Sequence, residues 1–279
     1  NKRKTMASSC VTVMVVVAAL LGVAVHGSVG WGDCTSSFIN GFHPDTPSGA
    51  VSICRDGVLA ISYDTTMIDP AFSAYYRTPA DVDRNVPGRD TFYEDPDLRS
   101  LGVTQAPVDS PAFNMTWNKG HLAPSRIMSS SDAEKHATYT MANIAPQDGY
   151  FNESPWGHLE DNVFNWIKSN SALHIVTGVG YRDRNRPRRS ADGIAIPDYY
   201  WKVVCDSVAG KSCGFYGHNV IEHDGVSAIH NVRYIEDNIY GGRLFPSDVC
   251  HTDSLDRDYW WTDRAMNPFF SISSVLSLI

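Results

Sequence analysis

Residues 141–170, MANIAPQDGYFNESPWGHLEDNVFNWIKSN, join a turn-rich stretch to a strong helical pattern. Apolar residues recur at helical spacing through 154–170, which predicts an amphipathic helix with one buried face. Ser154 or Asn152 suits the N-cap of this helix, and Pro155 suits its first turn because that position needs no amide hydrogen. The predicted apolar stripe consists of Trp156, Leu159, Val163, Phe164 and Ile167.

Runs of β-branched and aromatic residues lie on both sides of this helix and predict strands. The predicted strands are 58–66, 72–78, 172–181, 198–206 and 212–221. A second helix is expected over 129–144, where Ser131 and Glu134 suit a capping box. Strands mixed with a few helices indicate an α+β fold with a mostly antiparallel sheet.

The beginning of the chain has the composition of a secretory signal. An apolar run, VTVMVVVAALLGVAV at 11–25, is followed by small residues. We expect residues 1–27 to be a signal peptide, in which 1–5 are either leader residues or the cationic n-region, with cleavage before Ser28. A single membrane anchor is the alternative, for which the run is short. The sequence therefore predicts a secreted protein without stable membrane association, whose mature part, 28–279, forms one domain.

Cysteine usage agrees with an oxidising compartment. Pairing Cys34 with Cys54 would close a loop near the mature N-terminus, and pairing Cys205 with Cys213 would clip a hairpin. Cys250 would then be free or paired between chains. Asn114 begins a glycosylation sequon, and a second sequon at 152–154 is disfavoured by the proline that follows it.

The formal net charge of −8 argues against a protein that binds nucleic acid over its whole surface. The segment YRDRNRPRRSADG at 181–193 nevertheless concentrates positive charge between two predicted strands. It could follow a phosphate backbone, or it could be a solvated loop or a processing site. Its arginines are Arg182, Arg184, Arg186, Arg188 and Arg189.

Three segments together resemble the DNA/RNA non-specific endonucleases, the ββα-metal group that includes bacterial sugar-nonspecific nucleases and endonuclease G. They are WNKGHLAPS (117–125), MANIAPQDGYFNESPWGHLE (141–160) and VTGVGY with IPDYYWKVV (176–204). The resemblance covers about residues 55–250 and is most similar to the secreted animal branch. It implies a ββα-metal (His-Me finger) core and hydrolysis of phosphodiester bonds in DNA or RNA.

The resemblance also implies roles for individual residues. His121 matches the general base, Asn152 the direct metal ligand, and Glu160 the carboxylate that holds metal-bound water. Arg89 matches the arginine that stabilises the reacting phosphate, with Arg84 as a competitor. The supporting positions are Asn118, Asn143, Gln147 and Trp156.

Independently of the resemblance, these residue types suit phosphodiester hydrolysis. Phosphodiester hydrolysis needs a base for water and a cation for the developing charge. Histidine titrates near neutrality, and Mg²⁺ (or Mn²⁺) accepts oxygen ligands while keeping most of its waters. Gly120 would leave room for a close approach of backbone or phosphate.

The chain departs from the family just before His121. The family usually has Asp-Arg-Gly-His, whereas this chain has Asn118-Lys119-Gly120-His121. Lysine keeps the positive charge without the bidentate fork, and asparagine loses the carboxylate charge. The alternative function is therefore a catalytically weak extracellular nucleic-acid-binding protein on the same fold. A secreted scaffold protein is a third reading, and the sequence leaves the oligomeric state and the DNA or RNA preference open.

Overall fold

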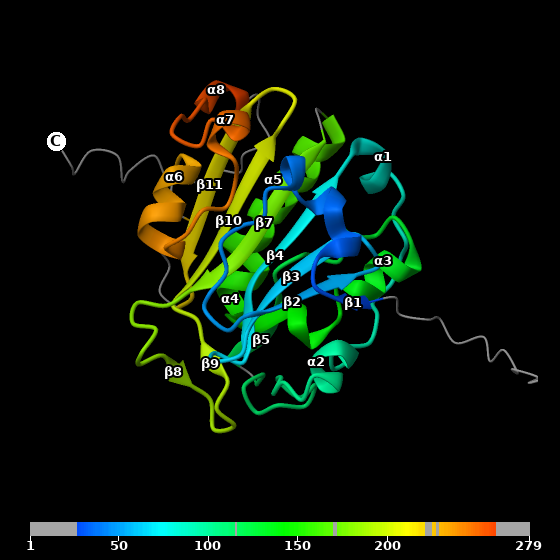
Figure 1. Cartoon of the computed structure of the whole chain (residues 1–279), viewed down its shortest axis with the longest axis vertical. Helices are drawn as coiled ribbons and strands as arrows, with labels where there is room; N and C mark the ends of the chain where they lie inside the picture. The colour runs from blue at the N-terminus through cyan, green and yellow to red at the C-terminus, as the bar shows by residue number, and fades with distance from the viewer. Residues whose placement is uncertain (1–26, 115, 170–171, 221–224, 227–228, 261–279) are drawn as a thin grey trace, which may run out of the picture.

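The computed structural model describes residues 27–114, 116–169, 172–220, 225–226 and 229–260. Its centre is a seven-stranded antiparallel sheet in the order β1-β2-β3-β4-β7-β10-β11 (Figure 1). The strands are β1 (Gly27–Val29), β2 (Val51–Arg55), β3 (Leu59–Asp64), β4 (Asp69–Arg77), β7 (Leu173–Gly180), β10 (Tyr199–Asp206) and β11 (Lys211–His218). Each predicted strand is present, and the predicted α+β class with an antiparallel sheet is confirmed.

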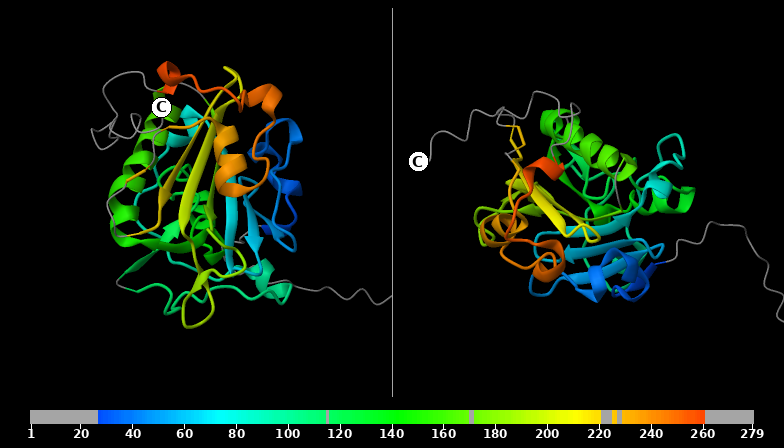
Figure 2. Two further views of the ribbon diagram at one scale, coloured as in Figure 1. Left: turned by 90° about the vertical axis from the view of Figure 1, so that its left-hand side faces the viewer. Right: turned by 90° about the horizontal axis from the view of Figure 1, so that it is seen from above.

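Helical segments cover both faces of the sheet (Figure 2). The long helix α5 (Gly157–Ser169) covers one face, and α6 (Val232–Ile235) and α7 (Ser247–Cys250) cover the other. Neighbouring strand residues therefore enter different cores: Ile175 packs with the α5 side, and Val176 packs with the α6 side. Because both faces are buried, the central strands read as continuous apolar runs.

Two disulfides join Cys34 to Cys54, as predicted, and Cys205 to Cys250. The predicted pair Cys205–Cys213 is wrong. The antiparallel register places Ser212 opposite Cys205, so Cys213 points to the other face of the sheet. Cys205 bonds Cys250 across a Cα–Cα distance of 5.7 Å, and Cys213 is a buried free thiol.

The predicted helix 129–144 is much shorter than expected. Ser131 does cap it by accepting the amide of Glu134 at 3.2 Å, but α3 spans only Asp132–Ala137. The chain then makes a 3-10 turn, Met141–Asn143, and enters a strand. Strand pairing thus overrides the helical preference of this alanine-containing stretch.

The remaining helices are short, and they are α1 (Pro79–Val82), α2 (Pro96–Ser100), α4 (Gly149–Phe151) and α8 (Arg257–Trp260), with 3-10 turns at Gly32–Ser37 and Ile39–Gly41 and a π-helical turn at Glu236–Tyr240. Among the described residues, no helix has the length and apolar composition needed to cross a bilayer. The predicted signal peptide lies outside the described residues except for Gly27, which begins β1.

Candidate active site

A small strand–strand–helix unit carries the predicted site residues. Strands β5 (Trp117–His121) and β6 (Ile144–Asp148) form an antiparallel ribbon in which His121 pairs with Ile144 and Trp117 with Asp148. The chain leaves β6 directly into a helical run that continues through α4 and a π-helical stretch, Asn152–Trp156, into α5. The unit therefore brings segments 117–121 and 144–169 together.

The helical run begins earlier than its sequence pattern predicts. Asp148 is the N-cap, and its carboxylate accepts the amide of Phe151 at 3.0 Å. The expectation that Asn152 or Ser154 caps the helix is wrong, and Pro155 lies inside the π-helical stretch instead of the first turn. Since Asp148 already provides the cap, the side-chain amide of Asn152 is not needed for it and makes no hydrogen bond to another described residue. Such π-helical turns are frequent at functional sites.

Asn118 fixes the turn that carries Asn152. Its Nδ2 donates to the Glu153 carboxylate at 2.9 Å, which links β5 to the helical run. A carboxylate at position 118 could not donate this bond and would face a like charge. The asparagine that departs from the family pattern thus has a local structural reason.

Glu160 lies near a buried positive charge. Burial raises the pKa of Glu160 to about 7, and the ammonium of Lys202 opposes this increase. Lys202 is fully buried in β10, donates to Thr177 Oγ1 at 2.6 Å, and lies 5.4 Å from the ring centroid of Trp156. Burial lowers the pKa of Lys202 to about 8, and the charge of Glu160 opposes that decrease.

Lys202 was missed by the sequence analysis. The available signal was a single lysine inside the apolar run YYWKVVCD of a predicted buried strand. A lysine is almost never buried without a partner, so its position in that run called for one. The carboxylate of Glu160 comes from a helix about forty residues earlier, so local spacing could not identify it.

His121 lies among aromatic rings at the end of β5. Its imidazole centroid is 5.4 Å from Phe92 and 5.1 Å from Tyr139. Its Nε2 is buried and makes no hydrogen bond to the described part of the chain. Burial lowers the pKa of His121 to about 4, so the ring is neutral at pH 7.

Lys119 and Trp117 share the face of β5 that carries His121, because alternate strand residues point the same way. The Lys119 ammonium lies 5.4 Å from the Phe92 ring centroid and 5.1 Å from that of Phe113. Contact with two rings stabilises a cation without neutralising its charge. Lys119 therefore keeps its positive charge available beside the histidine.

The opposite face of β5 is closed. A Cβ added to Gly120 would lie 2.4 Å from Oε1 of Gln147 and 2.7 Å from the hydroxyl of Tyr200. The space beside Gly120 is thus filled by protein, and the expectation that it admits a phosphate is wrong on this face. Gln147 is fully buried, and neither atom of its amide group has a hydrogen-bond partner among the described residues.

Asn143 and Trp156 hold the unit together from within. Asn143 is fully buried and uses both amide atoms, accepting from Ser73 at 2.7 Å and from the amide of Ala123 at 3.0 Å, and donating to Thr138 O at 2.9 Å. Trp156 is fully buried among Phe151, Tyr200 and Lys202. Both residues contact the ribbon and the helical run from within, and their supporting role stays a prediction.

Arg89 lies on an exposed part of the segment that leads to Phe92. Neither Arg89 nor its competitor Arg84 makes a hydrogen bond or ion pair with another described residue. Phe92 itself contacts both Lys119 and His121, so this segment lies against the face of β5 that carries Trp117, Lys119 and His121, which we call the open face.

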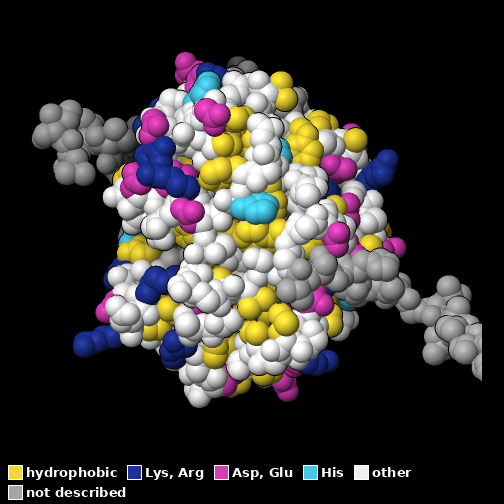
Figure 3. All heavy atoms as spheres, viewed as in Figure 1, with side chains coloured by type: hydrophobic (Ala, Val, Ile, Leu, Met, Phe, Trp, Pro, Cys, Tyr) yellow, Lys and Arg dark blue, Asp and Glu magenta, His cyan; other side chains and the backbone are white. Residues whose placement is uncertain are grey.

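The arginines of the 181–193 loop have different contacts. Arg184 pairs with Asp64, Arg189 donates to two backbone carbonyls, and Arg182 donates to Tyr199. Arg182 and Arg184 also lie over the rings of Tyr199 and Tyr181, whereas Arg188 lies over the indole of Trp117 in β5, 5.3 Å from the ring centroid. Figure 3 shows Lys and Arg side chains around the corner of the surface where Figure 1 places β8 (Arg188–Arg189).

The donors in the helical run suit a hydrated hard cation. Within the described residues no three His, Cys, Asp or Glu side chains cluster as a metal site. The uncapped amide of Asn152 and the half-buried carboxylate of Glu160 provide oxygen atoms, which Mg²⁺ prefers, and Mg²⁺ commonly uses few protein ligands. The residues present therefore fit a cation that is held mainly by water.

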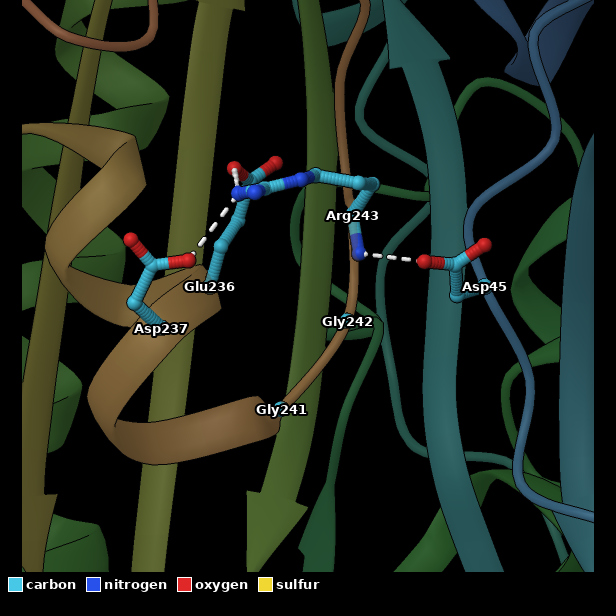
Figure 4. A pocket seen from close by; sticks show the side chains of 6 residues that line it. All are labelled: Asp45, Glu236, Asp237, Gly241, Gly242 and Arg243. Atoms are coloured by element: carbon cyan, nitrogen blue, oxygen red, sulfur yellow. Dashed lines mark hydrogen bonds and ion pairs between the residues drawn. The ribbon is translucent and has the colours of Figure 1, made fainter.

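An open hollow of about 570 Å³ lies away from this unit (Figure 4). It is lined by Asp45, Glu236, Asp237, Gly241, Gly242 and Arg243. Arg243 pairs with both Glu236 and Asp237, and Glu236 also accepts the amide of Leu244 at 2.7 Å. The charged groups that line this hollow thus pair with one another, and none of the predicted site residues lines it.

Comparison with known proteins shows which family this chain matches. The family described as DNA/RNA non-specific endonuclease matches residues 43–245. A nuclease from Nostoc is 28% identical over 43% of this chain and 42% of its own length. A salivary endonuclease from Culex quinquefasciatus is 33% identical over 45% of this chain and 36% of its own length. The matched region thus spans less than half of either relative.

A solved structure of the EndoG/EndoGI complex contains a chain with the same fold. The TM-score is 0.56 at 19% identity, and the match covers 77% of this chain and 90% of that chain. The family match extends over most of the sequence and includes β5, β6 and the helical run. The chain therefore belongs to the DNA/RNA non-specific endonuclease family.

Proposed function

We propose that this protein is a secreted, metal-dependent endonuclease that hydrolyses phosphodiester bonds of DNA or RNA without sequence specificity. The observation that carries the proposal is the buried, unpaired Nε2 of His121, in the same strand–strand–helix unit as Asn152 and Glu160. Family membership supports the reaction class. The two disulfides support an oxidising, extracellular compartment for the mature chain 28–279.

His121 acts as the general base. Burial keeps its imidazole neutral, so a ring nitrogen can accept a proton from water. An anionic phosphodiester bound beside the ring favours the protonated imidazole and raises its basicity. The resulting hydroxide attacks phosphorus in line, and the bond from phosphorus to the 3′ oxygen breaks. The products carry a 5′-phosphate and a 3′-hydroxyl, which is the outcome that family membership suggests.

Asn152 would hold Mg²⁺ directly and Glu160 would hold it through water, with Mn²⁺ as a substitute. When bound, the cation neutralises charge on the phosphoryl oxygens and on the leaving 3′ oxygen. Asn118 keeps the turn of Asn152 in place through Glu153, and Lys202 balances the charge of Glu160. Lys119 and Arg89 neutralise the remaining phosphate charge, while the arginines at 182–189 attract the backbone.

The test is nicking of supercoiled plasmid by the mature chain with Mg²⁺, with a chelator, and with the His121→Asn variant. We expect His121→Asn to lower the rate roughly 10²- to 10⁴-fold, the usual contribution of a general base. His251→Asn is the matched control, because His251 is exposed, has a positive φ that asparagine tolerates, and follows α7 at the opposite end of the sheet (Figure 1).

Cutting that survives both the chelator and His121→Asn would reject the proposal. Salt-sensitive plasmid binding by a wild-type chain that does not cut would instead support the weak nucleic-acid-binding protein.

A further inference from the structure

The open face of β5 presents three residues in a row, which we call the β5 row: Trp117, Lys119 and His121. They lie two residues apart, so neighbouring side chains are spaced by roughly 6.5–7 Å. His121 and Lys119 both contact Phe92, and Trp117 is covered by Arg188. Moving away from the histidine, the row thus presents one cation at Lys119 and a second above Trp117.

Arg188 differs from Arg182 and Arg184, which also lie over aromatic rings, because its ring belongs to β5. The side chains of Arg184 and Arg189 hold the loop through Asp64, Gly193 O and Thr66 O. The guanidinium of Arg188 lies on the indole of Trp117, and its one hydrogen bond to the described residues is a long one, 3.4 Å, to Pro197 O. A guanidinium that lies over a ring and makes a single long hydrogen bond has further N–H groups left for an anion.

The backbone around Arg188 supports this position. Arg188 pairs with Ile196 in the β8–β9 hairpin, whose second strand is β9 (Ala195–Ile196), and β9 packs against β6 of the ribbon. Arg188 is therefore carried by a paired strand that is attached to the same ribbon as His121. A flexible loop without strand pairing would not hold the Arg188 guanidinium over one particular indole.

We propose that Trp117 and Arg188 form a subsite for a backbone phosphate of the substrate, adjacent to the scissile phosphate. The polynucleotide would run along the β5 row, with the scissile phosphate at His121 and Lys119 and the next phosphate at the Arg188 edge. Trp117 is a positioning residue that holds the guanidinium over its ring. The subsite contacts phosphate and no base edge, so it favours longer chains of any sequence. This inference rests on the proposed nuclease function.

The experiment compares cleavage of two probes in Mg²⁺. One probe is an oligothymidylate long enough to span β5 and the β8–β9 hairpin, and the other is a dinucleoside monophosphate, which has only the scissile phosphate. We expect Arg188→Ala to lower kcat/KM for the oligothymidylate about tenfold, the size of one charge-assisted hydrogen bond, and to leave the dinucleoside unchanged. With chelator present, the salt slope of oligothymidylate binding should fall by about 1.

Four further variants separate geometry from charge and from folding. Arg257→Ala removes the same charge from the exposed, opposite end of the molecule and should affect neither probe selectively. Arg188→Lys keeps the charge but loses the flat fork, so it should recover only a small part of the loss. Trp117→Phe keeps a ring face and should retain most of the preference for the oligothymidylate over the dinucleoside monophosphate. Trp117→Leu should lose this preference.

The outcomes separate the subsite from the nuclease function. A wild-type chain that cleaves neither probe contradicts the proposed function itself. A wild-type chain that cleaves both, together with Arg188→Ala losses equal for the two probes or no larger than those of Arg257→Ala, overturns the subsite and leaves the nuclease function standing.

Discussion

The two faces of β5 differ in their contacts and their charge, although their residues alternate along one strand. The face with Trp117, Lys119 and His121 is lined by aromatic rings, carries positive charge, and leaves the Nε2 of His121 unpaired. The face with Asn118 and Gly120 is filled by neighbouring side chains and linked to the helical run. A strand with a period of two can therefore devote one face to substrate and the other to assembly.

This difference separates the two departures from the family motif. Lys119 is on the open face, where, under the proposed function, a change of cation would alter contact with phosphate. Asn118 is on the closed face, where a change of charge alters the contact with Glu153. Substitutions at Lys119 should thus affect contact with the substrate, whereas substitutions at Asn118 should affect the link to the helical run.

The largest effect on stability should come from the open face, through the pH dependence of His121. Its folded pKa, about 4, lies below the ordinary value of 6.5, so between these pH values the unfolded chain binds a proton that the folded chain does not. Wild-type stability therefore falls as the pH decreases through this window. The loss amounts to at most about 3 kcal/mol.

The His121→Asn variant lacks this loss. Its free energy of unfolding relative to wild type should increase steadily between pH 7 and pH 4, measured by urea denaturation. Glu160, whose pKa is raised to about 7, has the opposite pH dependence, but it is present in both proteins and cancels in the difference. A stability difference that stays constant over this range would show that burial does not suppress protonation of His121.

On the closed face, Gly120→Ala should destabilise the fold. The new Cβ would lie 2.4 Å from Gln147 Oε1 and 2.6 Å from Gln147 Cβ, so the ribbon or the Gln147 side chain must shift. Overpacking of this kind costs about 2 kcal/mol and should lower the midpoint of denaturant unfolding.

Gly149→Ala is the matched control for this change. Its Cβ would meet only Asn118, at 3.6 Å or more, in a helical turn where alanine is favourable. If Gly120→Ala were as well tolerated as Gly149→Ala, the closed face would have room that the structure does not show.

The sheet and the long helix were predictable because their patterns are local. Alternating or continuous apolar runs identified the central strands, and the stripe from Trp156 to Ile167 identified α5. The start of the helical run was not predictable in this way, because its cap, Asp148, is also the last residue of β6. Sequence alone presented Asn152 both as a cap and as the metal ligand that the resemblance implies, and the structure removes the role as a cap.

Contacts between distant segments account for the remaining differences. The pairing of Cys205 with Cys250 depends on which face of the sheet each cysteine occupies, and the register decides that. The role of Lys202 depends on Glu160, which lies in α5, the long helix that covers one face of the sheet. The motif residues could be named from the sequence, but which face of β5 each one occupies required the pairing of β5 with β6.

The smallest effect should follow from restoring the family residue at position 118. Asn118→Asp replaces a donor to Glu153 with a second carboxylate, so stability should fall by less than about 1 kcal/mol, and by less still at high salt. The turn that carries Asn152 loses its link to β5, so plasmid nicking should not become faster. The double variant Asn118→Asp with Glu153→Gln restores a donor–acceptor pair and should recover wild-type stability and rate. A single Asn118→Asp variant that nicks plasmid faster than wild type would instead mean that the missing carboxylate limits activity, and that the closed face of β5 takes part in the reaction.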